Sequence, residues 1–290
     1  MKKKQARLPD GADFYYLNRL ELDFMYKEIF ESDAYSNELV QFNDGDTIID
    51  IGANIGLFIH FVTRRCKDVT FYAFEPVPRV FRTLEWNFEQ SNGHQFNLFN
   101  CGVARESGEA TFTVLKHCTA RSTMHPEYSP TVDSVEGKAR EEEFMLLTFK
   151  ELPNPVIRTV IAILPPFVRR WLARRVVNYH GRSKQITCEL KTVSQVIDEN
   201  DIEKIDLLKV DAENSEVEIL KGIRDEHWPR IRQLIIEVHP VAAGEQGADE
   251  PLEAVLQLME EHGFETSVPY DKTLHPAPTV FARQTQSTSQ

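Results

Sequence analysis

The stretch "TIIDIGANIGLF", residues 47–58, places two glycines and an asparagine between a β-branched apolar run and an amphipathic segment. The apolar run is typical of a strand buried on both faces in a parallel sheet, and a helix is expected after the second glycine. A glycine-rich turn after the first strand of such a sheet lies at its carboxyl edge, where open α/β sheets bind ligands. Three interpretations are open: a dinucleotide loop, a loop for another charged cofactor, or only a tight turn.

The spacing of the glycines argues against a dinucleotide loop. That fingerprint is G-x-G-x-x-G, and its middle glycine lets the backbone approach a pyrophosphate. Here Asn54 stands between Gly52 and Gly56, where the middle glycine would be, and no Gly-Lys-Ser/Thr follows to make a Walker loop.

Two acidic residues indicate a different ligand. Asp50 precedes the turn, and Glu75 ends the next predicted strand, at about the 20-residue spacing expected of a carboxylate that binds a ribose. A carboxylate beside the turn would repel a pyrophosphate and would suit a cationic ligand. S-adenosylmethionine carries an ammonium, a sulfonium and a ribose, so it fits this pattern. The alternative is that the glycines only permit a tight turn and close helix packing, with Asp50 as a helix cap.

Strand and helix patterns alternate along most of the chain, which predicts βαβ units and an α/β fold with a doubly wound, mostly parallel sheet. Residues 1–46 are expected to form a helical lead-in, because residues 13–42 have apolar side chains at helical spacing. One domain is predicted over residues 47–283, with an inserted lid at 117–185 where the alternation breaks. Its last two strands are close in sequence, which favours a hairpin and hence an antiparallel C-terminal strand. Residues 284–290 are predicted to be a polar tail.

Composition restricts the classes of function. The chain has 290 residues and a formal net charge of −12, which disfavours nucleic acid as a partner and favours a small-molecule or carrier-bound acceptor. A cytoplasmic protein is expected, because no apolar stretch reaches the roughly 20 residues of a membrane span and the basic N-terminus lacks the apolar core of a secretory signal. The four cysteines lack paired spacing, so neither a zinc site nor a disulfide framework is predicted.

A second polar cluster follows the buried strand in "LLKVDAENSEVEIL", residues 207–220. Asp211 and Glu213 lie where this strand ends, and Glu237 and His239 lie on one face at the end of the next strand. A histidine at this edge, with an ordinary pKa of about 6.5, could take a proton from an acceptor hydroxyl. His239, Asp211 and Glu213 are therefore the catalytic candidates. Two alternatives are that Asn214 or Ser215 caps a helix, and that Asp211, Glu213 and Glu237 bind a divalent cation. No metal is predicted.

Five segments carry a shared pattern: "DIGANIGLF" (50–58), "FYAFEPVPRVFRTLEWN" (71–87), "NCGVARESGEATF" (100–112), "LLKVDAENSEVEILKGI" (207–223) and "QLIIEVH" (233–239). Together they resemble the FkbM family of S-adenosylmethionine-dependent methyltransferases, and the resemblance runs from about Tyr26 to the end of the chain. "MYKEIFESDAY" and "DEHWPRIRQLIIEVHP" are most similar to members from polyketide and nonribosomal-peptide pathways. The resemblance implies a class I, Rossmann-like methyltransferase fold and O-methylation of a hydroxyl on a secondary-metabolite, sugar or carrier-bound acceptor.

The resemblance also implies roles for single residues. The methionine end of S-adenosylmethionine would be held by Asp50, Gly52, Asn54 and Gly56, the ribose by Glu75, and the adenine edge by Asn100, Cys101 and Gly102. One departure is visible, because the family's usual Glu-Gly is Glu213-Asn214 here. A nicotinamide-dependent oxidoreductase and a cofactor-binding module without catalysis remain the alternative functions.

The predicted lid has an unusual charge. Residues 151–184 contain seven basic residues and one acid in a chain of net charge −12. The basic residues are Arg158, Arg169, Arg170, Arg174, Arg175, Arg182 and Lys184. A lid over a hydrophobic substrate, a docking surface for an acidic carrier protein and a membrane-surface helix all fit this combination of apolar and basic residues. The alternative is an amphipathic helical pair packed on the body.

Overall fold

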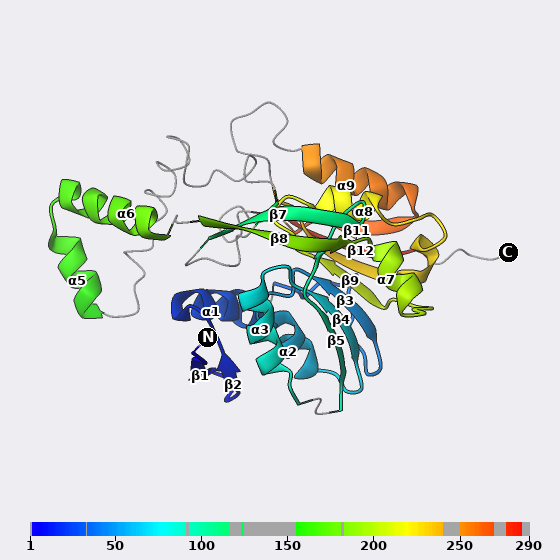
Figure 1. The fold of residues 1–290 in the computed structure, drawn as a ribbon, viewed down its shortest axis with the longest axis horizontal. Helices are drawn as coiled ribbons and strands as arrows, with labels where there is room; N and C mark the ends of the chain where they lie inside the picture. The colour runs from blue at the N-terminus through cyan, green and yellow to red at the C-terminus, as the bar shows by residue number, and fades with distance from the viewer. Residues whose placement is uncertain are drawn as a thin grey trace.

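A seven-stranded sheet forms the centre of the protein. The computed structural model describes residues 2–32, 34–90, 93–115, 123–124, 155–180, 183–239, 250–269 and 277–285. The strands of the central sheet are β3 (Thr47–Ile51), β4 (Thr70–Phe74), β5 (Gln95–Phe99), β9 (Leu207–Val210), β10 (Gln233–Glu237), β11 (Phe264–Ser267) and β12 (Thr279–Gln284). Their order is β11-β12-β10-β9-β3-β4-β5 (Figure 1).

The direction of the strands confirms the predicted class I methyltransferase fold. β3 pairs in parallel with β4 and with β9, and β10 continues the parallel set beside β9. β12 runs antiparallel to both β10 and β11. The predicted antiparallel C-terminal strand is therefore present. The parallel strands turn their carboxyl ends to one edge of the sheet, which brings the turns after β3, β4, β9 and β10 together.

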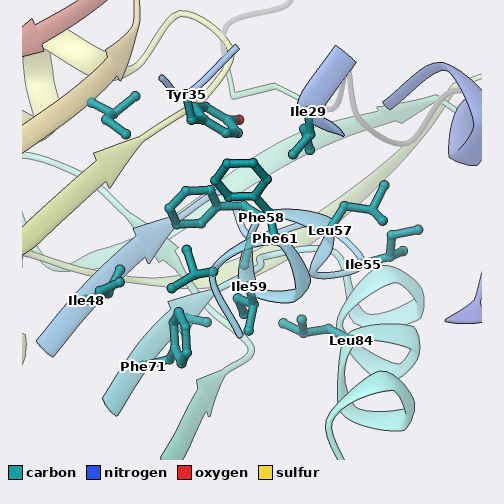
Figure 2. Packing of buried hydrophobic residues seen from close by; sticks show 14 of the residues in the cluster. Ile29, Tyr35, Ile48, Ile55, Leu57, Phe58, Ile59, Phe61, Phe71 and Leu84 are labelled. Atoms are coloured by element: carbon teal, nitrogen blue, oxygen red, sulfur yellow. The ribbon is translucent and has the colours of Figure 1, made fainter. Parts of the chain in front are cut away.

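Helices cover both faces of this sheet. α2 (Leu57–Thr63) and α3 (Pro78–Asn87) pack on one face, while α7 (Val193–Glu199), α8 (Glu216–Lys221) and α9 (Glu250–Glu261) pack on the other (Figure 1). Alternate residues of β3 serve the two faces, since Ile48 belongs to the first core and Ile49 to the second. Figure 2 shows the first core, where Phe58 and Phe61 of α2 lie beside Tyr35. The continuous apolar run of β3 is explained by this burial on both faces.

A second, smaller sheet holds β6 (Gly102–Val103), β7 (Gly108–Leu115) and β8 (Ser183–Lys191) in the order β6-β8-β7. The sequence predicts one strand over residues 96–105, but the structure divides it at Asn100, after which the chain leaves the central sheet. The side-chain nitrogen of Asn100 donates to the carbonyl oxygens of Glu75, at 2.8 Å, and Pro76, at 3.2 Å. These bonds fix the chain at the point where it changes sheets.

The N-terminal segment differs in part from the predicted helical lead-in. β1 (Gln5–Arg7) and β2 (Asp13–Tyr15) form an antiparallel hairpin, and helix begins only with α1 (Arg19–Tyr26), which continues into the π-helix η1 (Lys27–Glu31). Asn87 of α3 accepts from the backbone of Tyr15 at 2.7 Å and donates to the Ile55 carbonyl at 2.8 Å. The hairpin is thereby connected to the glycine turn through one side chain.

The described part of the predicted lid consists mainly of α5 (Pro155–Ile163) and α6 (Pro166–His180), which lie beside the body, at the opposite end of the view from the C-terminus (Figure 1). The structure differs from two predicted boundaries. Residues 183–185 belong to β8, and Gln284 is the last residue of β12, so neither the insertion nor the tail includes them. Among the described residues, no helix combines the length and apolar character needed to cross a membrane.

Candidate active site

The turn after β3 uses its own hydrogen-bond donors internally. Each backbone N–H group of residues 52–56 donates to an acceptor within the protein. The acceptors are the carbonyl oxygens of Phe74 and Ala53, the side-chain oxygen of Asn54 and the carboxylate of Glu75. A dinucleotide loop binds a pyrophosphate through backbone N–H groups that point at the ligand. No such donor remains in residues 52–56, which argues against a pyrophosphate at this turn.

The two glycines are required by close packing. Gly52 has a φ of +78°, and a Cβ atom there would lie 1.8 Å from the carbonyl oxygen of Asp211. Gly56 has a φ of +93°, and its Cβ would lie 2.2 Å from Cε2 of Phe88. Packing of the turn therefore explains both glycines, as the alternative interpretation expected. The approach of Gly52 to Asp211 also brings the turns after β3 and β9 into direct contact.

Asp50 does not stand open beside the turn. Its side chain is 0% exposed, and the ammonium of Lys209, 4% exposed, lies 3.3 Å from Oδ1 of Asp50 and 3.4 Å from Oδ2 of Asp211. Burial raises the pKa of Asp50, although Lys209 opposes that rise. The electrostatic reason for expecting a cationic ligand is thus corrected, since Lys209 already compensates part of this charge. The sequence signal for Lys209 is a charged residue inside a buried strand, and it was missed.

Glu75 faces the same turn from the end of β4. Its side chain is buried, with Oε1 accepting from the Val77 amide at 2.8 Å and Oε2 from the Asn54 amide at 3.1 Å. Burial raises the pKa of Glu75 to about 8. In its ionised form each carboxylate oxygen can accept a second hydrogen bond, so Glu75 could accept from two ribose hydroxyls, and such bonds would lower its pKa again.

The segment of Asn100, Cys101 and Gly102 begins beside Glu75. Asn100 contacts the Glu75 carbonyl directly, whereas the buried thiol of Cys101 packs in the core, and burial raises its pKa to about 11. A Cβ on Gly102 would meet Cδ2 of Leu190 at 2.8 Å. These contacts place the three residues near the turn after β4, and their role at an adenine edge remains a prediction.

The second predicted cluster surrounds His239. Nδ1 of His239 lies 2.8 Å from Oε1 of Glu216, and Nε2 lies 3.8 Å from carboxylate oxygens of both Glu213 and Glu237. Glu216 is 2% exposed, and the same Oε1 accepts from the backbone amides of residues 212 and 214 at 3.2 Å each. Glu216 was not among the site residues that the sequence predicted. The structure makes it the residue that orients His239.

The acids control the charge of this cluster. Burial alone would lower the pKa of His239, but Glu213, Glu216 and Glu237 together raise it well above 6.5. Burial, with Asp211 adding to it, raises the pKa of Glu237 to about 8. The acids therefore favour the protonated form of His239 in the ligand-free protein, in which Nδ1 donates to Glu216.

Comparisons with known proteins identify the family of the chain. A family model described as "Methyltransferase FkbM domain" matches residues 50–266. The chain belongs to the FkbM methyltransferase family. It is accordingly an S-adenosylmethionine-dependent methyltransferase. It is 32% identical over 260 residues to the 31-O-demethyl-FK506 methyltransferase FkbM of Streptomyces tacrolimicus, and the match covers 89% of this chain and 87% of that relative.

Two further comparisons differ in extent. The chain is 30% identical over 270 residues to the AMB antimetabolite synthetase AmbE of Pseudomonas aeruginosa, and the match covers 93% of this chain but only 12% of that much longer protein. A crystal structure of a methyltransferase FkbM from Methylobacillus flagellatus aligns with a TM-score of 0.46 and 13% identity, covering 84% of this chain and 45% of that one.

The departure from the FkbM pattern at Glu213-Asn214 has a structural explanation. Asn214 has a φ of +77° and Glu213 a φ of +46°. Asparagine is among the few residues other than glycine that adopt this left-handed region readily, so Asn214 can replace the family's glycine. Thr123, which was not predicted, donates from Oγ1 to the Glu213 carbonyl at 2.6 Å and so connects the described start of the insertion to this turn.

Three side chains of this cluster lie close enough together to hold a metal ion. Ligand atoms of Asp211, Glu237 and His239 lie within 4.8 Å of one another. The sequence suggested Asp211, Glu213 and Glu237 as possible metal ligands, so in the structure His239 replaces Glu213 in this set. A shallow surface hollow of about 420 Å³ lies elsewhere, over Phe42 and Arg65, and none of its lining residues is a predicted site residue. The cluster at the strand ends around His239 therefore remains the candidate site.

Proposed function

We propose that this FkbM methyltransferase transfers a methyl group from S-adenosylmethionine to a hydroxyl group of a small-molecule or carrier-bound acceptor, with His239 as the base. The observation that carries the proposal is the 2.8 Å contact between Nδ1 of His239 and the buried Glu216. With Nδ1 held there, Nε2 is the atom available to an acceptor, and it lies beside the turn that contacts Gly52. A positioned imidazole with a carboxylate on its other nitrogen is suited to proton abstraction.

The residues present fit the cofactor. Asp50 lies buried beside the turn, where Lys209 pairs with its Oδ1 at 3.3 Å, so Oδ2 would be the atom that receives the amino end of the methionine moiety. Glu75 has free acceptor capacity for the ribose, and the segment from Asn100 to Gly102 would border the adenine. When bound, S-adenosylmethionine supplies a methyl group on a positively charged sulfur.

The protein's own groups then move one proton. Nε2 of His239 takes the hydroxyl proton of the acceptor, and the resulting imidazolium is stabilised by Glu216 at Nδ1 and by Glu213 and Glu237 near Nε2. The bound cofactor would supply a methyl carbon for in-line displacement, with S-adenosylhomocysteine as the leaving group, so the protein would contribute to the rate by aligning the acceptor oxygen. Because the acids raise the pKa of His239, the neutral base becomes available only as the pH rises, and the rate is expected to increase with pH.

Two relatives support the acceptor class. The name of the Streptomyces tacrolimicus relative specifies an O-demethyl substrate, which favours an oxygen acceptor here. The AmbE match lies within a long synthetase, which supports an acceptor bound to a carrier. The N–H groups of residues 52–56 are all hydrogen-bonded within the protein, which disfavours a nicotinamide-dependent oxidoreductase.

The test is incubation of the protein with isotopically labelled S-adenosylmethionine and a panel of hydroxyl-bearing and amine-bearing acceptors, free and on a carrier protein, followed by mass spectrometry. We expect label on oxygen, and a loss of about 10²–10⁴-fold in rate in His239→Gln with unchanged affinity for S-adenosylhomocysteine. His262→Gln is the matched control, because His262 stacks on Trp228 away from the site. Label found only on nitrogen, or an unchanged rate in His239→Gln, would contradict the proposal. Cofactor binding without any transfer would favour the non-catalytic alternative.

A further inference from the structure

Exposed apolar side chains are concentrated on α5 and α6. Of the large apolar side chains that are clearly exposed in the described structure, six lie on these two helices, with exposed fractions between 49% and 76%. They are Val156, Ile157, Val160, Ile163, Phe167 and Trp171. Isolated exposed apolar residues are normal on soluble proteins, but a concentration on one pair of helices indicates an interaction surface.

The helical spacing arranges these side chains on faces. Val156, Val160 and Ile163 follow one another at intervals of four and three residues on α5, and Phe167 and Trp171 are four residues apart on α6. Arginines flank the aromatic face, and the guanidinium of Arg175 lies 5.5 Å from the centre of the Trp171 ring. The surface is therefore apolar with a basic border.

The charge of this surface is opposite to that of the chain. Residues 155–180 contain five arginines and no acid, while the whole chain has a net charge of −12. Arginine guanidinium groups bind phosphate oxygens in paired hydrogen bonds, and tryptophan and phenylalanine favour the boundary between head groups and acyl chains. The side chains of residues 156–163 are polar only at Arg158 and Thr159, so α5 offers a nearly continuous apolar surface of the kind that enters the boundary of the acyl chains.

We propose that α5 and α6 bind the surface of a lipid bilayer that contains anionic phospholipids. The apolar faces enter the boundary of the acyl chains, and the arginines contact the phosphate groups. The helices lie along this surface and do not cross it, in agreement with their length. This binding does not depend on the acceptor or on the base of the methyl transfer.

The experiment is co-sedimentation of the full chain with vesicles of phosphatidylcholine alone and of equal parts phosphatidylcholine and phosphatidylglycerol. We expect binding to the anionic vesicles only, weakened by added salt. Arg170→Glu with Arg175→Glu should weaken that binding at least about tenfold, since each basic residue near the surface contributes appreciably. The matched control is Lys2→Glu with Lys27→Glu, two exposed lysines elsewhere that give the same change in net charge.

A second pair of variants tests the apolar contribution. Phe167→Ser with Trp171→Ser should weaken vesicle binding, whereas Leu20→Ser with Phe24→Ser removes similarly exposed side chains from α1 and should not. Unchanged affinity for S-adenosylhomocysteine and an unchanged melting temperature confirm that each variant is folded. No binding of the unmodified chain to anionic vesicles, or equal weakening by the control pairs, overturns the proposal. It is likewise overturned if the α6 substitutions impair only binding to a purified acidic carrier protein.

Discussion

The turns after β3 and β9 are built alike but have different tasks. Both connect a buried strand to a helix at the carboxyl edge of the sheet, and they touch where Gly52 meets the Asp211 carbonyl. In the first turn, every N–H group of residues 52–56 is bonded within the protein, and Asp50 is buried beside Lys209. In the second, carboxylates and His239 remain partly exposed around a backbone that is left-handed at two residues. The glycine motif thus forms the scaffold, while the candidate reactive groups gather around the second turn, where the end of β10 adds Glu237 and His239.

Gly52→Ala should have the largest effect, because it attacks the contact between the two turns. The new Cβ would have to displace the Asp211 backbone and would also occupy a left-handed conformation, so we expect a loss of stability of about 4 kcal/mol or more in urea denaturation. Gly45→Ala is the matched control, because Gly45 has nearly the same φ, +79°, and nothing within 4 Å of its Cβ. It should cost only about 1–2 kcal/mol. Equal losses in both variants would show that the contact contributes nothing beyond backbone strain.

Lys209→Met should have the next largest effect, because it leaves Asp50 buried without its cation. Breaking a buried ion pair from one side typically costs about 3–5 kcal/mol. The double variant Lys209→Met with Asp50→Leu removes both charges and should recover most of that stability in the same denaturation experiment. If the double variant is as unstable as the single one, the loss comes from packing, and the 3.3 Å ion pair does not account for it.

Periodicity alone predicted much of this scaffold, and tertiary contacts explain what it missed. The apolar run of β3 and the shared face of Glu237 and His239 follow from local patterns, which are visible in one strand at a time. The pairing of Lys209 with Asp50 depends on two strands distant in sequence, and the contact of Glu216 with His239 depends on how α8 sits against β10. The N-terminal hairpin was missed because three-residue strands are too short to show alternation.

Glu75→Gln tests the burial of Glu75 against the first turn, through the pH dependence of stability. The folded pKa of Glu75, about 8, lies above its ordinary value of 4.5, so the folded protein binds this proton more tightly than the unfolded chain. Its contribution is fully present below about pH 4.5 and is lost as the pH rises to about 8, with a slope of up to about 1.4 kcal/mol per pH unit. Glu75→Gln should flatten the fall of stability over this window in the ligand-free protein. Glu260→Gln, at an exposed position of α9, should leave the slope as it is.

Glu213→Gln tests the effect of the second turn on His239, through the pH dependence of kcat/KM. Glu213 makes the largest single charge interaction that raises the pKa of His239, so its neutral replacement should lower that pKa. The acid limb of the pH profile of kcat/KM should therefore move to lower pH. Glu218→Gln provides the control, because Glu218 lies on α8 but pairs with Arg105 and Lys221. If the acid limb does not move, His239 is not the base in the rate-determining proton transfer.

Removal of divalent cations should have the smallest effect. Ligand atoms of Asp211, Glu237 and His239 lie close enough together to bind a cation, yet two positive groups of the protein already act on these acids. The ammonium of Lys209 lies 3.4 Å from Asp211, and the protonated His239 faces Glu237 at 3.8 Å. A cation would have to compete with both charges, so treatment with a chelator is expected to leave the rate of methyl transfer unchanged. A rate that falls with the chelator and returns with Mg²⁺ or Mn²⁺ would instead make the second turn a metal centre that acidifies the acceptor.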